Sequence, residues 1–189
     1  MRKNIYDFDG TIYDGDSSID FYKYCFKKKK SICKYWLKQV WYMLLYFLKI
    51  KTKTEMKQEF FCFLKDFKSS DKLVKEFWES HKSKIKDWYL QKDHKDDIII
   101  SASPEFLLKI PAKELKVFDL MASDVDIKTG IFKSKNCHDK EKVKILKEKY
   151  PNVTINEVYT DSLSDLPLLE IAKKGFIVKK DKIIEYQKN

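Results

Sequence analysis

Lys3–Thr11 (KNIYDFDGT) is the stretch from which the fold can be inferred, because an apolar run leads directly into two aspartates, a glycine and a threonine. Lys3–Phe8 predicts a short strand, and the Asp-Gly-Thr that follows predicts a turn at the carboxyl end of that strand. Asp7 would then lie at the end of the strand, and Asp9 would project from the turn that follows. The sequence therefore places two carboxylates at the edge of a predicted sheet.

Two further polar clusters also follow predicted strands. Asp97–Ser101 (DIIIS) is a β-branched run typical of a buried parallel strand, and it leads into Ser101–Pro104 (SASP). Ile155–Thr160 predicts another strand, which leads into Asp161–Asp165 (DSLSD). Each cluster alone has the composition of an ordinary helix cap. Because ligands bind at the carboxyl ends of strands in parallel sheets, we expect the three clusters together to converge on a site.

The predicted elements after residue 95 alternate between strand and helix. This order favours an α/β fold with a doubly wound, Rossmann-like parallel sheet. Besides the strands above, the expected elements are strands at Lys116–Leu120 and Phe176–Lys179, a hairpin at Asp124–Ser134, and helices at Glu105–Leu108, Asp139–Tyr150 and Leu166–Lys174, the last capped by Gly175.

Residues 17–95 differ from the rest of the chain in composition. They contain 20 lysines and nine acidic residues, a net charge of +11, and most of the aromatic residues, whereas the remainder is nearly neutral. The expected elements here are a helix capped by Ser17 or Ser18, the apolar helix Trp36–Ile50, and helices at Lys53–Lys68 and Asp71–Asp87. We therefore divide the chain into a catalytic core, residues 1–16 and 96–189, and an inserted all-helical cap, residues 17–95.

The overall charge of +10 indicates an anionic partner, and nearly all of it comes from lysine, since Arg2 is the only arginine. Lysine lacks the planar guanidinium that reads base edges, which disfavours a sequence-specific DNA-binding protein. No signal peptide is recognisable, and the cysteines lack metal-binding spacing, which predicts free thiols in a cytoplasmic protein. These cysteines are Cys25, Cys33, Cys62 and Cys137.

The three converging clusters also predict a cofactor. Carboxylates that meet at one point raise one another's pKa unless a cation neutralises them. Oxygen ligands favour a hard ion, and Mg²⁺ typically uses one or two carboxylates together with a substrate phosphate. We therefore expect Mg²⁺ at this edge of the sheet.

Taken together, the motifs resemble those of the haloacid-dehalogenase-like hydrolase superfamily. Asp7–Thr11 resembles its first motif, and Ser101–Ser103 resembles its Ser/Thr motif. Lys142 resembles the lysine of its third motif, and Thr160–Glu170 its acidic fourth motif. The resemblance covers residues 1–16 and 96–180. It is strongest to the phosphoserine-phosphatase-like subclass, in which a helical cap follows the first motif.

The resemblance implies a phosphomonoester hydrolase that forms an aspartyl-phosphate on a small phosphorylated metabolite. Asp7 would be the nucleophile, and Asp9 would be the general acid and then the base. Mg²⁺ would be bound by Asp7, by the backbone carbonyl of Asp9 and by Asp161. Asp165 would lie beside the metal or orient the motif lysine.

The remaining motif residues would bind the phosphoryl group. The resemblance assigns this role to Ser101 and a neighbouring backbone N–H, here that of Ala102. Lys142 would offset the negative charge of the nucleophile and the phosphoryl group. Lys140 is a nearby alternative, and Lys142 is preferred because Val143 follows it directly, as in the family's Lys-Val pattern.

Two features bear on the substrate. Asp16 occupies the place of a glutamate that contacts the substrate amine in phosphoserine phosphatases, but it could equally cap the helix that follows. Those enzymes also carry an arginine in the cap, and residues 17–95 contain none. A lysine could replace it without the bidentate grip. Phosphoserine is therefore one possible substrate and not the favoured one.

Trp36–Ile50 leaves a membrane alternative open. It is too short to cross a bilayer, but it could be an interfacial helix as well as a helix buried in the cap. The basic cap is similar to those of phosphatidylglycerophosphate phosphatases, which implies a peripheral lipid-phosphate phosphatase on an anionic membrane. A third hypothesis is a non-catalytic adaptor that binds nucleic acid through lysines and aromatic residues, although a nucleic-acid partner is disfavoured.

Overall fold

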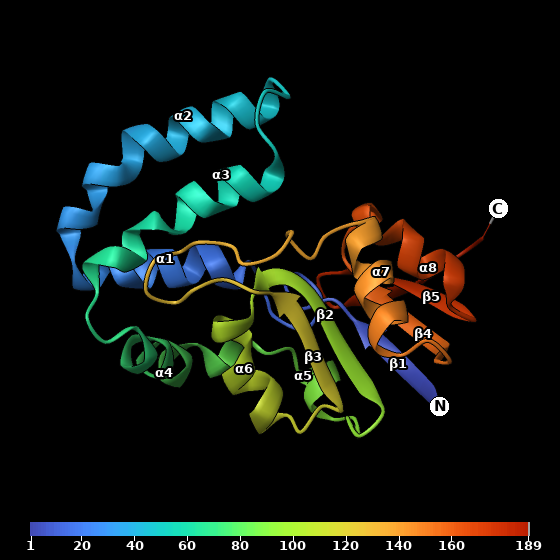
Figure 1. Ribbon diagram of the computed structural model, residues 1–189. Helices are drawn as coiled ribbons and strands as arrows, with labels where there is room; N and C mark the ends of the chain where they lie inside the picture. The colour runs from blue at the N-terminus through green and yellow to red at the C-terminus, as the bar shows by residue number, and fades with distance from the viewer. Residues whose placement is uncertain (189) are drawn as a thin grey trace.

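The computed structural model describes residues 1–188 (Figure 1). Its strands are β1 (Arg2–Tyr6), β2 (Asp97–Pro104), β3 (Asp119–Ser123), β4 (Thr154–Thr160), β5 (Lys174–Lys179) and β6 (Lys182–Tyr186). Its helices are α1 (Ser17–Lys28), α2 (Trp36–Phe47), α3 (Lys53–Phe60), α4 (Ser70–His81), α5 (Asp87–Leu90), α6 (Glu105–Glu114), α7 (Lys140–Lys149) and α8 (Leu166–Ile171). Short 3₁₀ turns cover Lys30–Tyr35, Phe61–Asp66, Lys82–Lys84 and Leu163–Asp165.

The strands form one six-stranded sheet in the order β3-β2-β1-β4-β5-β6. β1 to β5 pair in parallel, and β6 is antiparallel to β5. β1 is central, with Ile5 opposite Ile98 of β2 and Val158 of β4. The carboxyl ends of β1, β2 and β4 therefore lie together, which confirms the predicted α/β class with a parallel sheet.

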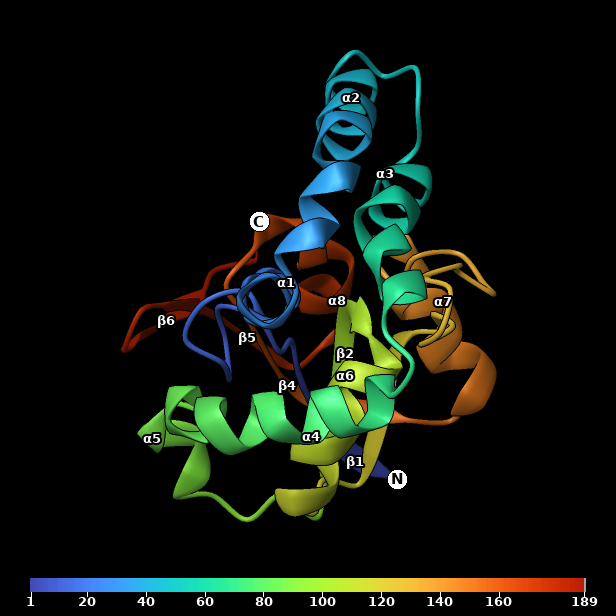
Figure 2. The ribbon, with the colours of Figure 1, turned by 90° about the vertical axis from the view of Figure 1, so that its left-hand side faces the viewer.

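The two faces of the sheet are covered by different helices. Ile5 points into a buried cluster with Leu146 of α7 and Leu169 of α8, whereas Tyr6 joins a second cluster on the opposite face. This alternation follows from the two-residue period of a strand. The second cluster contains buried residues of α1, α4, α5 and α6, and Figure 2 shows α4 crossing this side of the molecule.

All regular elements between residues 17 and 95 are helical or 3₁₀. α2 and α3 form a hairpin that projects from the rest of the molecule at the top of Figure 1. α1 and α4 instead pack onto the sheet side, where Trp78 donates a buried hydrogen bond from Nε1 to the carbonyl of Leu107 in α6, at 2.6 Å. Lys86 donates from Nζ to the carbonyls of Gly10 and Lys180. The boundaries of core and cap remain our proposal, and buried residues of both contribute to the cluster that contains Tyr6.

Several expected elements lie elsewhere. The strand predicted at Lys116–Leu120 begins only at Asp119, because Lys116 has a left-handed backbone (φ 57°) that ends the preceding turn. The hairpin predicted at Asp124–Ser134 is reduced to a single bridge between Val125 and Phe132. β6 was not expected from its sequence.

The predicted cap role of Gly175 is wrong. α8 already ends at Ile171, and Gly175 lies within β5, opposite Val158 and Tyr186. A Cβ on this glycine would lie 2.8 Å from Cδ2 of Leu169, so the residue allows β5 and α8 to approach closely.

The helices of residues 17–95 are shorter than expected. α2 ends at Phe47, and the helix predicted over Lys53–Lys68 becomes α3 followed by a 3₁₀ turn. The cap of α1 is Asp16 and not a serine, because its Oδ1 accepts a hydrogen bond from the N–H of Ile19 at 2.9 Å. Within residues 1–188, no helix has both the length and the apolar composition needed to cross a membrane.

Candidate active site

Lys142 connects two of the three predicted clusters. Its Nζ donates to Oδ1 of Asp7 at 3.0 Å and to Oδ2 of Asp165 at 2.7 Å. β1 supplies the aspartate at its carboxyl end, α7 the lysine, and the 3₁₀ turn after β4 the second carboxylate. Only 2% of the lysine side chain is exposed, so it is a buried charge held between two carboxylates.

The electrostatics of this triad depend on burial. Burial raises the pKa of Asp7 to about 7; Lys142 opposes this rise, and the neighbouring carboxylates of Asp165 and Asp9 add to it. Burial alone would lower the pKa of Lys142, but Asp7 and Asp165 raise it above its usual value. The lysine therefore remains charged, and its charge favours the ionised form of Asp7 against the effect of burial.

Asp9 is held apart from this triad by serines. Its Oδ1 accepts from the N–H of Ser17 at 2.6 Å, and its Oδ2 accepts from Oγ of Ser103 at 2.5 Å. Ser103 Oγ also lies 2.9 Å from Oγ of Ser18. Burial raises the pKa of Asp9, the nearby charge of Asp16 adds to the rise, and these hydrogen bonds oppose it. A raised pKa suits a group that must donate a proton.

Asp161 lies against the turn that follows Asp9. A Cβ on Gly10 would lie 2.1 Å from Oδ2 of Asp161, and Gly10 has a left-handed backbone (φ 71°). The glycine of the first motif is therefore required both for its conformation and for the space that the carboxylate occupies. Partial burial raises the pKa of Asp161, and Asp165 adds to the rise.

The serine cluster after β2 makes contacts that the sequence did not predict. Oγ of Ser101, which was expected to bind the phosphoryl group, accepts a hydrogen bond from the N–H of Ser103 at 3.1 Å. The side chain that reaches Asp9 is that of Ser103, for which no role was predicted. The carbonyl of Ala102 accepts from Ser123 Oγ and from Lys57 Nζ, at 3.1 and 2.7 Å.

Lys57 and Lys53 are site residues that sequence reasoning did not single out. They lie one turn apart on α3, so both reach from the projecting hairpin toward the edge of the sheet. Burial lowers the pKa of Lys57 to about 8, and the charge of Lys53 contributes. Burial also lowers the pKa of Lys53, and the charge of Lys142 lowers it further. Their spacing of four on a predicted helix was the available signal, but 20 lysines in this region obscured it.

The donors at this edge of the sheet fit Mg²⁺. They are oxygen atoms, and Oδ1 of Asp165 is buried without a hydrogen-bond partner among the described residues. Among residues 1–188, no three His, Cys, Asp or Glu side chains form a complete metal-binding group.

The other predicted residues are placed as follows. Asp16 is exposed, and its side chain caps α1. Of its two predicted roles, helix capping is therefore the one for which the structure shows a contact. Lys140, the alternative to Lys142, is exposed at the start of α7 and is not in the buried triad. Oδ2 of Asp165 also accepts from Oγ1 of Thr160 at 2.9 Å, so this carboxylate orients Lys142.

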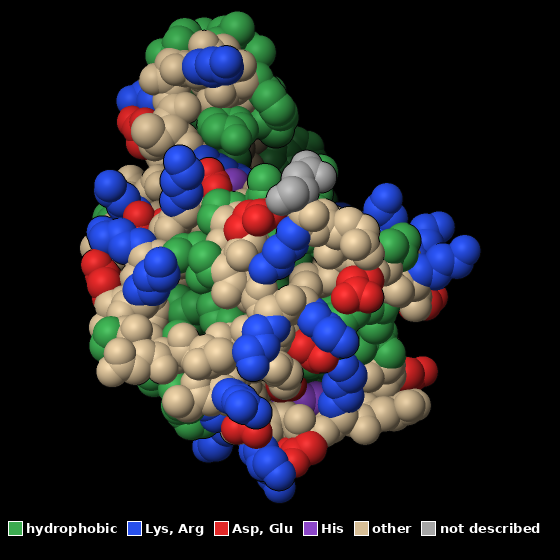
Figure 3. All heavy atoms as spheres, turned by 90° about the vertical axis from the view of Figure 1, so that its right-hand side faces the viewer, with side chains coloured by type: hydrophobic (Ala, Val, Ile, Leu, Met, Phe, Trp, Pro, Cys, Tyr) green, Lys and Arg blue, Asp and Glu red, His purple; other side chains and the backbone are tan. Residues whose placement is uncertain are grey.

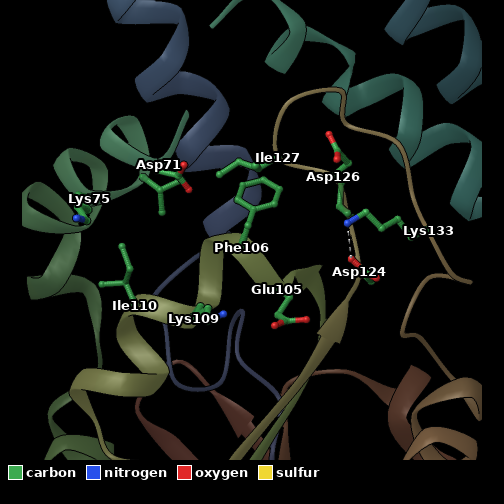
Figure 4. Close-up of a pocket in the computed structure, with 12 residues that line it drawn as sticks. Asp71, Lys75, Glu105, Phe106, Lys109, Ile110, Asp124, Asp126, Ile127 and Lys133 are labelled. Carbon is green, nitrogen blue, oxygen red and sulfur yellow. Dashed lines mark ion pairs between the residues drawn. The ribbon is translucent and has the colours of Figure 1, made fainter. Parts of the chain in front are cut away.

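Two hollows lie near this region. A cavity of about 600 Å³ lies between the start of α3 and the start of α7; its lining includes Lys53, Asn136 and His138. A second, of about 380 Å³, is lined by α4, α6 and the loop after β3 (Figure 4), and none of the predicted site residues lines it. The first cavity is also not lined by Asp7, Asp9, Ser101, Lys142, Asp161 or Asp165, but it lies at the start of α7, the helix that carries Lys142, and Lys53 and Lys140 line it.

The sheet order and the helices inserted between β1 and β2 define a Rossmann-like α/β fold with aspartates at the carboxyl edge of its sheet. Residues 5–170 match the haloacid dehalogenase-like hydrolase family, and the chain belongs to that family. Comparison with curated proteins gave no match.

Solved structures with the same fold are distant in sequence. A protein of unknown function from Bordetella pertussis Tohama I has a TM-score of 0.73 at 16% identity, covering 92% of this chain and 88% of that one. A phosphoserine phosphohydrolase-like protein from Francisella tularensis has a TM-score of 0.58 at 16% identity, covering 93% and 86%. A phospho-aspartyl intermediate analogue of phosphoserine phosphatase has a TM-score of 0.57 at 14% identity, covering 93% and 86%.

Proposed function

We propose that the protein is a Mg²⁺-dependent phosphomonoester hydrolase that acts on a small phosphorylated metabolite through an aspartyl-phosphate. The observation that carries the proposal is the buried ion-pair triad of Lys142 with Asp7 and Asp165, beside an Asp9 of raised pKa. This combination supplies an oriented carboxylate nucleophile and a separate proton donor within one site. Family membership and the structural likeness to phosphoserine phosphatases support it.

In the first step, a carboxylate oxygen of Asp7 attacks phosphorus and the bond to the leaving oxygen breaks. Asp9 donates its proton to that leaving oxygen, so the alcohol departs neutral. Lys142 fixes the nucleophile through Oδ1 and offsets the charge that gathers on the phosphoryl oxygens. Bound Mg²⁺, held by Asp7, Asp161 and the carbonyl of Asp9, would supply Lewis-acid stabilisation of that charge.

In the second step, water attacks the phosphorus of the aspartyl-phosphate. Asp9, now ionised, accepts the proton of the water, and the bond between phosphorus and Asp7 breaks. Free phosphate leaves and both aspartates return to their starting states. The hydrogen bonds of Asp9 to Ser17 and Ser103 hold it in place for both proton transfers.

Lys53 and Lys57 support an anionic substrate. Both lie on α3 above the edge of the sheet, and Lys57 is held there by the carbonyl of Ala102. Their charges would attract the phosphoryl group or a second anionic group of the substrate, such as the carboxylate of a phosphoserine-like molecule. A lysine can serve there as a point charge without the directional grip of arginine.

An assay with para-nitrophenyl phosphate and Mg²⁺ tests the proposal. We expect turnover that a chelator removes, and we expect Asp7→Asn to abolish it because an amide oxygen is too weak a nucleophile. Turnover in Asp7→Asn equal to that of the wild type would disprove the assignment. The thermal unfolding midpoint of the variant serves as the folding control.

A lipid phosphate is the second candidate substrate. The observation that favours it is that no residue of the apolar helix α2 is buried, which would place a membrane-facing surface next to the cavity at the start of α3. Comparing turnover of lysophosphatidate in vesicles with that of glycerol phosphate distinguishes the two. The hypothesis of a non-catalytic nucleic-acid adaptor is disfavoured, because nucleic-acid binding does not require the buried ion pairs of Lys142 with Asp7 and Asp165.

A further inference from the structure

α2 carries its apolar residues on the outside of the molecule. Its half-buried residues, among them Gln39, Tyr42 and Tyr46, face α3, and Gln39 Nε2 donates to the carbonyl of Phe60. The opposite face, here called the α2 stripe, follows the spacing of three and four residues that marks one side of a helix. It consists of Leu37, Val40, Trp41, Leu44, Phe47 and Leu48.

The α2 stripe is strongly exposed. Leu37 is 88% exposed and Phe47 71%, and Figure 3 shows hydrophobic side chains along the top of the projecting hairpin. A helix on the surface of a soluble domain normally turns such a face inward. A contiguous apolar surface of this kind marks an interaction site.

The charges around the stripe identify the partner. Residues 21–54 contain ten lysines and no aspartate or glutamate. Lysines flank α2 at both ends, with Lys30 and Lys34 before it and Lys49 and Lys51 after it. Lys34, Lys38 and Lys51 form ion pairs with acidic residues outside α2, whereas Lys30 and Lys49 have no acidic partner among the described residues, and α2 itself contains no acidic residue. An apolar face with aromatic residues and a lysine border is the composition of a helix that lies in the interface of an anionic membrane.

A second copy of this chain fits less well. Two α2 stripes in contact would bring the lysines at the helix ends together, and of these only Lys34 and Lys51 have acidic partners within the chain. The length of α2 also suits the membrane plane. Its 12 residues span about 18 Å, well short of the roughly 30 Å of a bilayer core, so the helix would lie along the surface.

We propose that the α2 stripe docks the protein on an anionic lipid bilayer, with α2 lying in the interface and the flanking lysines on the lipid headgroups. α3 lies between α2 and the sheet and supplies Lys53 and Lys57 to the candidate active site. Docking through α2 therefore leaves the candidate active site outside the bilayer. The proposal does not depend on which phosphate ester is hydrolysed.

Flotation with vesicles of phosphatidylcholine, with and without phosphatidylglycerol, tests the proposal. We expect binding that requires phosphatidylglycerol and weakens with salt. Leu37→Ser combined with Phe47→Ser should weaken binding by about tenfold or more, because two apolar side chains no longer enter the interface. Ile184→Ser is the matched control, since Ile184 is 48% exposed on β6, away from the hairpin, and it should bind as the wild type does.

Three results would overturn the proposal. The first is a folded wild-type protein that does not float with phosphatidylglycerol vesicles at low salt. The second is equal binding by the double variant. The third is a wild-type dimer that the double variant dissociates, which would assign the stripe to a second copy. Hydrolysis of para-nitrophenyl phosphate should be unchanged in the double variant, so a failure of docking is distinguishable from a failure of the proposed function.

Discussion

Lys142 is the residue in which sequence and site agree best. Sequence preferred it over Lys140 because of the valine that follows, and the structure places Lys142 between Asp7 and Asp165 while Lys140 is exposed. The distinction has a physical cause. The first turn of α7 faces the sheet edge on one side only, so two lysines separated by two positions point in different directions.

Replacing each lysine tests this distinction. Lys142→Met should lower kcat by roughly 10²–10³-fold, as for removal of one charge-stabilising donor, because Asp7 loses its orienting partner. Lys140→Met should change kcat little. Steady-state kinetics on an aryl phosphate give the comparison, and a similar loss in both variants would contradict the assignment.

Lys57 leads to a prediction about pH. Its pKa is lowered to about 8 by burial and by Lys53, so its charge is lost as the pH rises through about 8, where a substrate phosphate is already fully ionised. The KM for an anionic substrate should therefore rise above this pH. Lys57→Met should have a high KM at all pH values and no such rise.

Lys53→Met provides the matched control for this effect. Removing that neighbouring charge should move the rise in KM to higher pH, because the charge of Lys53 helps to lower the pKa of Lys57. KM measured as a function of pH in the three proteins would show this. Identical profiles would exclude Lys57 from substrate binding.

At the scale of elements, the start of α1 offers a test of the two roles predicted for Asp16. Asp16 was predicted either to bind a substrate amine or to cap this helix, and its Oδ1 accepts from the N–H of Ile19. Asp16→Ala should lower the free energy of unfolding by about 0.5–2 kcal/mol, whereas Asp16→Asn should retain most of it. Urea unfolding measures this.

Kinetics then decide whether Asp16 also has the predicted substrate role. If it acts only as a cap, KM should be unchanged in both variants, because a smaller folded fraction lowers the apparent kcat and not KM. A rise of KM in Asp16→Asn, with stability retained, would instead show contact with substrate.

The elements also show where prediction from sequence reached its limits. The strands that carry the site, β1, β2 and β4, were predicted near their observed positions because each is a β-branched or apolar run that ends in polar residues. β6 was missed because it is an edge strand with exposed side chains, so its sequence carries no buried pattern. The role of Gly175 was misassigned because the sequence alone does not distinguish a glycine needed for close packing from a glycine that ends a helix.

At the scale of the whole molecule, the boundary between core and cap raises the question of independent folding. Phe21 of α1 is fully buried in a cluster that also contains Tyr6 of β1 and Leu107 of α6. If residues 17–95 were a separate unit, such a cluster would be divided between two cores. We expect one unfolding transition for the chain.

Phe21→Ala should lower the free energy of that single transition by about 3–5 kcal/mol, the usual cost of removing a buried phenylalanine. Leu37→Ala, at an 88% exposed position, should change it by no more than about 0.5 kcal/mol. Calorimetry with both variants is the measurement. Two separate transitions in the wild type, of which only one moves in Phe21→Ala, would show that the cap folds alone.

The sequence by itself determined the class of fold and the strand ends at which the candidate site residues lie, because local patterns of apolar residues and turns encode strands and their ends. Only the tertiary structure decided that Ser103 holds Asp9, that Lys53 and Lys57 reach the site from α3, and that the apolar face of α2 is exposed. The physical reason is that these features depend on contacts between distant segments. A helix with an apolar face has the same sequence pattern whether a protein core or a membrane covers that face.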